Sequence, residues 1–131
     1  MGTKSLVKLA DADTSFFPGS DGGGTVMRFT IDKATNGAES FAMMVNQIAP
    51  GTQDGAGVHT HDSEHGFYIL RGEGRYIVGD EEFVASPGDS VFIRANVPHL
   101  VSNNGDKPFE YVVIYAPQGP EIDLRARFLK K

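Results

Sequence analysis

The 131-residue sequence contains no cysteine. This absence excludes a disulfide scaffold, a zinc site with thiolate ligands and a cysteine nucleophile, so any bound metal has nitrogen or oxygen ligands. Long apolar runs are also absent. No segment approaches the roughly 20 residues of a membrane-spanning helix, and the N-terminus lacks the apolar stretch of a signal peptide. We therefore expect a soluble, cytoplasmic protein.

Positive charge is scarce. The 12 lysine and arginine residues are outnumbered by 17 aspartate and glutamate residues, and the formal net charge is −5 at pH 7. Proteins that bind nucleic acids usually carry a basic patch or stripe, and nothing in this charge balance provides one. The sequence therefore predicts neither a nucleic-acid partner nor a membrane partner.

Helical periodicity is the third absence. Apolar residues do not follow a 3.6-residue period for more than about two turns, and short β-like runs alternate with turns rich in glycine and proline. This pattern is typical of an all-β sandwich or barrel. The length and the 40% hydrophobic content predict a single domain with one core.

Several segments have the pattern of strands. Gly79 and Asp80 have the composition of a tight hairpin turn. Residues 5–10 are a candidate edge strand, and residues 11–24 have the composition of a loop. Residues 121–128 alternate charged and apolar side chains, which favours a last strand, with a short helix as the alternative. The other expected strands are residues 25–32, 41–51, 58–70, 75–78, 81–84, 90–94, 99–103 and 109–117.

All four histidines of the chain fit one metal site. If the segment around His59, His61 and His65 is extended, the even spacing turns all three imidazoles to one side of a sheet and Glu64 to the other. His99 is distant in sequence, as expected if a neighbouring strand completes the coordination sphere. The alternative is that these histidines are ordinary surface or core residues.

The spacing of these residues resembles that of the cupin family. The first cupin motif is G(X)5HXH(X)3,4E(X)6G. His59 and His61 match HXH, and Gly72 matches the last glycine. His65 occupies the position of the glutamate ligand, and Gln53 that of the leading glycine. The resemblance therefore implies a site in which histidine replaces the usual carboxylate.

The second cupin motif, G(X)5PXG(X)2H(X)3N, is matched at three positions: Gly88, His99 and Asn103. Arg94 stands in place of its proline and Asn96 in place of its central glycine. Asparagine tolerates a left-handed backbone better than most residues, so we expect Asn96 to take over the glycine turn. The resemblance covers about residues 41–116.

The resemblance implies a single-domain jelly roll with a four-histidine metal site. Residues 1–40 would form N-terminal strands and a loop, residues 41–116 the barrel core, and residues 117–131 a segment that packs on the barrel or on a partner subunit. The ligands would be His59, His61, His65 and His99, around one divalent ion of manganese, iron, nickel, zinc or copper. Small cupins of this kind are expected to form homodimers.

Strand parity indicates the walls of the site. Phe67 and Ile69 continue the face of His65, and Val97, Val101 and Asn103 share that of His99, so we expect a mostly apolar pocket. Asn103 is more typical of a residue that braces the strand than of a ligand-binding residue. Tyr111 and Tyr115 are interpreted as packing residues.

Three functions are compatible with this site. An ion held by neutral imidazoles keeps its full charge and favours anionic oxygen ligands on a small substrate. The first function is an O2-dependent, dioxygenase-like oxidoreductase that acts on an enolisable substrate. The second is a lyase, isomerase or hydrolase in which the metal is a Lewis acid, although Phe67 replaces the tyrosine base of some cupin lyases. The third is a binding module without catalysis.

Overall fold

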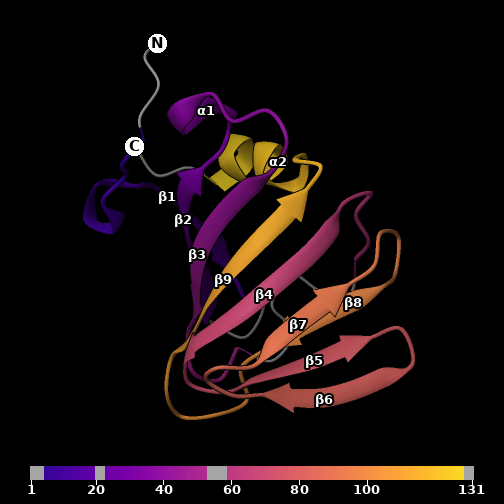
Figure 1. The fold of residues 1–131 in the computed structure, drawn as a ribbon. Coiled ribbons are helices and arrows are strands. Elements are labelled where there is room, and N and C mark those ends of the chain that lie inside the picture. The colour runs from indigo at the N-terminus through magenta and orange to yellow at the C-terminus, as the bar shows by residue number, and fades with distance from the viewer. Residues whose placement is uncertain (1–4, 20–22, 53–58, 129–131) are drawn as a thin grey trace.

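Two antiparallel sheets form the fold of the residues that the computed structural model describes, 5–19, 23–52 and 59–128 (Figure 1). The strands are β1 (Asp13–Pro18), β2 (Gly24–Ile31), β3 (Ala42–Ile48), β4 (Glu64–Arg71), β5 (Gly74–Val78), β6 (Glu81–Ala85), β7 (Ser90–Ile93), β8 (His99–Ser102) and β9 (Phe109–Ala116). The larger sheet has the order β1-β2-β3-β9-β4-β7, and the smaller has the order β6-β5-β8. The all-β prediction is correct.

Side chains from both sheets meet in one core. Phe29 and Met44 extend from the larger sheet and Tyr76 from the smaller, and all three are fully buried. The predicted neighbours β2 and β3 pair antiparallel, from Thr25 opposite Ile48 onward. Gly79, with φ of 58°, supplies the left-handed turn of the β5–β6 hairpin, as its sequence predicted.

The prediction of an edge strand at residues 5–10 followed by a loop at residues 11–24 is wrong. Leu9–Asp11 is a short 3-10 helix and not part of an edge strand, whereas β1 occupies the segment expected to be a loop. β1 pairs along its length with β2, and Asp13 lies opposite Phe29. An edge strand with a proline at its end carries little alternation of its own, and its pairing with β2 defines it.

The favoured C-terminal strand is also wrong, because Pro120–Phe128 is the nine-residue helix α2. Proline suits the first turn of a helix, and acidic residues there interact favourably with the helix dipole. Glu121 is an acidic residue of this first turn, and its carboxylate also accepts a hydrogen bond from the Gly119 N–H at 2.7 Å. No helix in the described ranges is long and apolar enough to cross a membrane.

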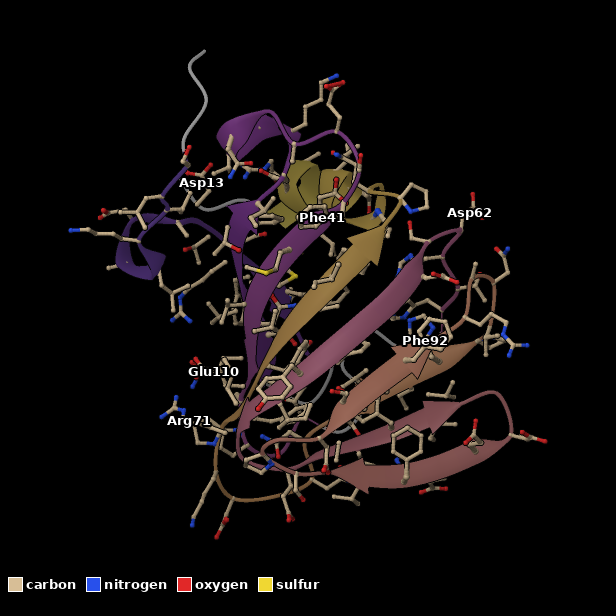
Figure 2. All side chains as sticks on the ribbon, in the orientation of Figure 1. Asp13, Phe41, Asp62, Arg71, Phe92 and Glu110 are labelled. Carbon is tan, nitrogen blue, oxygen red and sulfur yellow. The ribbon has the colours of Figure 1, made fainter. Side chains whose placement is uncertain are left out.

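Arg125 fastens α2 to the larger sheet. Its guanidinium lies 2.6 Å from a carboxylate oxygen of Asp13 (labelled in Figure 2) and 3.0 Å from one of Asp32. The same group lies over the Phe29 ring, 4.5 Å from its centroid. Asp32 is buried and also caps the short helix α1 (Lys33–Asn36) by accepting the Thr35 N–H at 2.8 Å. The helix is therefore held in one place by a half-buried ion-pair network.

A second ion pair joins neighbouring strands at the other end of β9. Arg71 and Glu110 lie side by side in Figure 2, and the nitrogen–oxygen distance is 3.2 Å. The Arg71 side chain is 61% exposed, so solvent screens this pair far more than the Arg125 network. The end of the sheet beside α2 is thus the more firmly fastened one.

Candidate metal centre

The backbone brings the histidines together from a connection and two strands. His59 and His99 form an isolated bridge in which each N–H donates to the other's carbonyl oxygen, at 3.1 and 3.0 Å. The His61 carbonyl accepts the Asn96 N–H at 2.7 Å. His65 lies in β4 opposite Tyr115 of β9. His99 begins β8.

The expected extended strand through all three early histidines is wrong. β4 begins only at Glu64, and the chain bends at residues 62–63, so His59 and His61 reach the site from the preceding connection. The parity within β4 is as predicted, because His65 is buried and Glu64 is exposed. The bridge to His99, and not strand alternation, sets the direction of His59.

Three histidines form a compact group of nitrogen atoms. The ligand atoms of His59, His61 and His99 lie within 4.8 Å of one another. His65 falls outside this group, but its ring centroid is 4.8 Å from that of His61 and 5.0 Å from that of His99. The fourth ligand predicted from the sequence therefore remains a prediction.

The ring spacing suits a common ion. A ligating imidazole nitrogen lies about 2.1 Å from a metal such as zinc, which puts ring centroids roughly 3.2 Å from it and about 4.5 Å apart at right angles. The centroids of His59 and His61 are 4.7 Å apart, those of His59 and His99 4.4 Å, and those of His61 and His99 5.5 Å. These values match rings arranged around one point.

The donor atoms are also prepared for a metal. The Nδ1 atom of His99 lies 2.9 Å from the Val97 carbonyl oxygen and donates to it, which leaves Nε2 unprotonated as a ligand. Nε2 of His65 is buried and has no hydrogen-bond partner among the described residues. A buried nitrogen without a partner costs free energy, and an ion would remove that cost. The residues fit a transition metal.

Burial keeps these imidazoles neutral. Desolvation, assisted by the neighbouring histidines, lowers the pKa of His61 to about 4 and that of His65 to about 3. Burial lowers the pKa of His99 as well, against the opposing effect of its hydrogen bond to Val97. Metals bind the neutral ring, so these three side chains are ready as ligands at neutral pH without first losing a proton.

Acidification should destabilise the metal-free protein. The His65 pKa is about 3 in the folded state and near 6.5 in the unfolded chain, so below about pH 6.5 the unfolded state binds more protons. Stability is then lost as the pH falls, by about 2 kcal/mol from His65 between about pH 7 and pH 5. Urea unfolding of chelator-treated protein at both pH values measures this. His65→Gln should show a smaller loss, and an equal loss in both proteins would contradict the assignment.

The histidines open into a cavity of about 260 Å³ between the sheets. Its other walls are mostly apolar or aromatic, and no lysine or arginine is among the described residues that line it. Beside the four histidines, the cavity is lined by Phe17, Thr25, Met27, Asn46, Ile48, Phe67, Val101, Tyr111, Tyr115, Asp123 and Leu124. Such a lining suits a largely apolar small molecule.

Five side chains were expected in these walls. Phe67 and Val101 line the cavity. The others do not. Ile69 is fully buried in the core, and Val97 is partly buried and packs against the core. Asn103 braces a turn, where its amide donates to the Ile48 and Lys107 carbonyl oxygens at 3.0 and 2.8 Å.

Asn96, Arg94 and Gln53 depart from the cupin motifs, and the structure describes the first two. Asn96 has a φ of 65°, so it takes the left-handed turn in place of glycine, as predicted. Arg94 is exposed to solvent. Gln53, at the leading glycine of the first motif, lies outside the described residues. The turn at Asn96 is followed after two residues by His99 at the start of β8.

Several cavity residues were missed or interpreted differently from sequence. Tyr111 and Tyr115 are buried in the core, as expected of packing residues, but both also line the cavity, and the Tyr115 ring lies 4.5 Å from that of His65. Burial raises the pKa of both tyrosines, so their hydroxyls stay protonated. Asn46 was not identified. The signal for Tyr111 and Tyr115 was the pairing of β9 with β4, the strand that contains His65, because this pairing places alternate residues of β9 at the site.

Comparison with known proteins gives a family match over the centre of the chain. A family model described as a cupin domain matches residues 44–115. An uncharacterized protein of Methanocaldococcus jannaschii is 33% identical over 61 residues, which make up 46% of this chain and 49% of that protein. The chain thus spans about half the length of this curated relative.

Solved structures share the fold. The polyketide cyclase RemF from Streptomyces resistomycificus superposes with a TM-score of 0.73 at 22% identity, over 90% of this chain and 82% of that one. A predicted oxalate decarboxylase from Thermotoga maritima also has a TM-score of 0.73, at 20% identity, over 86% of this chain and 99% of that one. At these identities the likeness extends to the fold alone.

Proposed function

The chain belongs to the cupin family and has its jelly-roll fold, and from this premise we propose that it is a metal-dependent enzyme that oxidises a small enolisable or phenolic substrate with O2. The observation that carries the proposal is the histidine cluster at the wall of an apolar, aromatic cavity. A substrate bound there would be largely apolar and would present an oxyanion to the histidines. The activity is dioxygenase-like.

His59, His61 and His99 would hold the ion, with His65 as the proposed fourth ligand. A bound transition metal supplies a Lewis acid for the substrate oxyanion and, if redox-active, the electron transfer that O2 chemistry needs. Because the ligands are neutral imidazoles, they leave the positive charge of the site uncompensated. This charge attracts an enolate or phenolate more strongly than a site with a carboxylate ligand would.

The cavity walls complete the site. Phe67 and Met27 offer apolar surface on which a flat substrate can lie, and they exclude water from the reacting atoms. Tyr115, beside His65, is held protonated by burial and so provides a hydrogen-bond donor to a substrate oxygen. In the absence of a basic residue among the described lining, the histidine end is the favoured place for a negative charge.

A protonated tyrosine next to the histidines also favours a second candidate, non-redox chemistry in which Tyr115 delivers a proton to a carbanion or alkoxide. This candidate covers lyases, isomerases and hydrolases. It needs neither O2 nor a redox-active ion, which separates it from the first candidate by experiment.

Oxygen uptake tests the proposal. Protein purified without added metal is first analysed for its elements, then loaded separately with iron, manganese, nickel, copper and zinc, and supplied with simple β-diketones. We expect O2 consumption with one or more redox-active ions, and none with zinc or with the His99→Ala variant. Turnover with zinc in anaerobic buffer would favour the non-redox candidate. Binding of the diketones without conversion under all conditions would favour a binding module.

The homodimer expected from the sequence remains a proposal. Three large apolar side chains, Tyr68, Phe92 and Ile114, are exposed on the outer face of β4, β7 and β9 (Phe92 is labelled in Figure 2). Burial against a second copy would remove them from water. Light scattering during gel filtration measures the mass of the assembly in solution.

A further inference from the structure

The cavity has a polar group that the metal centre does not use. Asn46 lies in the middle of β3, is only 4% exposed, and lines the cavity. It pairs with Met27 of β2 on one side and with Tyr111 of β9 on the other. A primary amide in an apolar wall costs free energy unless its donors and acceptor find partners.

Most of the hydrogen-bonding capacity of Asn46 is unused. Its Nδ2 atom donates to the Tyr111 hydroxyl at 3.5 Å, the long limit for such a bond, and its Oδ1 atom has no partner in the described structure. The buried Asn103 differs, because both its amide nitrogen and its amide oxygen have backbone partners at 2.8 to 3.0 Å. Asn103 is thus a structural brace, whereas Asn46 has capacity left for a ligand.

Asn46 and Tyr111 lie away from the histidines. Tyr115 is opposite His65 across the β4–β9 pair, and Tyr111 precedes it by four residues, or roughly 13 Å along an extended strand. Phe67 lies between, with ring centroids 6.1 Å from His65 and 5.3 Å from Tyr111. The cavity therefore has a cationic end when a metal is bound, the Phe67 ring in between, and two uncharged polar side chains, Asn46 and Tyr111, farther along.

We infer that Asn46 and Tyr111 bind a hydroxyl group of the substrate, so that the substrate is an elongated aromatic or enolic molecule with an oxyanion at one end and a hydroxyl at the other. The inference rests on the proposed function, which places the oxyanion at the histidines. A hydroxyl can donate to Oδ1 of Asn46 and accept from the Tyr111 hydroxyl. A second anionic group is disfavoured at this end because no basic residue is among the described lining.

Two phenols that differ only by one hydroxyl group test the inference. para-Phenylphenol offers one phenol to the histidines, and para,para′-biphenol adds a hydroxyl at the far end. Calorimetry on zinc-loaded protein should show the biphenol binding about tenfold more tightly, as expected for a satisfied buried hydrogen bond. Asn46→Leu should reduce this ratio to about the twofold statistical factor of a symmetric ligand. Tyr111→Phe, which keeps the ring, should reduce it in part. The matched control Gln47→Leu replaces the neighbouring amide of β3, which does not line the cavity, and should keep the ratio.

The outcomes separate the inference from the proposed function. Similar affinities for the two phenols in the unmodified protein, or a preference that survives in Asn46→Leu, would overturn the inference alone. If neither phenol binds although zinc is bound, the proposed function is overturned, and the inference with it. Circular dichroism verifies that each variant is folded before its affinities are compared.

Discussion

His99→Ala should lower the affinity of the protein for Zn²⁺ by about 100-fold or more, since even the partners of ligating histidines cost 10- to 100-fold when removed. His99 belongs to the compact group of three nitrogens, and its hydrogen bond to the Val97 carbonyl presents Nε2 to the ion. Competition with a coloured chelator measures the affinity. A change of less than about tenfold would exclude His99 as a ligand.

Glu64→Ala is the control for this experiment, and His65→Ala extends it. Glu64→Ala removes an exposed carboxylate one residue from His65 and should leave the zinc affinity unchanged. His65→Ala decides between three and four ligands: a loss comparable to that of His99→Ala assigns it to the coordination sphere. A loss near that of Glu64→Ala would show that His65 only lines the site.

Gly72→Ala should destabilise the fold by more than about 3 kcal/mol, or prevent folding. Gly72 begins the turn after β4 with a φ of 72°, and an added Cβ would lie 2.1 Å from the Pro108 carbonyl oxygen. The left-handed conformation costs an alanine about 1 kcal/mol, and the clash with a backbone atom adds the rest. Urea unfolding followed by circular dichroism measures the change in the free energy of unfolding.

Gly37→Ala is the matched control. Gly37 has a nearly identical φ of 76°, but no atom lies within 4 Å of where its Cβ would be. It should therefore lose only the conformational contribution, about 1 kcal/mol. Equal losses in the two variants would mean that the Pro108 carbonyl moves aside freely, and that the close approach at Gly72 does not restrain the turn.

The parts of the site that sequence predicted are those set by local geometry. Parity within β4 separates His65 from Glu64, and the left-handed turn at Asn96 follows from what asparagine tolerates. The motif spacing identified His99 although it is far along the chain. For His65 and Asn96 a short stretch of residues carries enough information, because its conformation depends little on distant contacts.

Long-range pairing explains what the sequence did not show. β1 has little pattern of its own and is defined by β2, and α2 is fastened by Arg125 to carboxylates more than 90 residues earlier. Asn46 enters the cavity only because β3 lies beside β9 in the sheet order. A hydrophobic pattern read residue by residue contains no information on these neighbours.

The last helix contributes Asp123 and Leu124 to the cavity but no side chain to the histidine cluster as described. One wall of the cavity is thus formed by a helix that is separate from the segments bearing the histidines. Exchanging this segment between related proteins, with the Arg125 anchor kept, offers a simple route to altered substrate choice. The reactive centre and the selectivity of such proteins can then evolve at different rates.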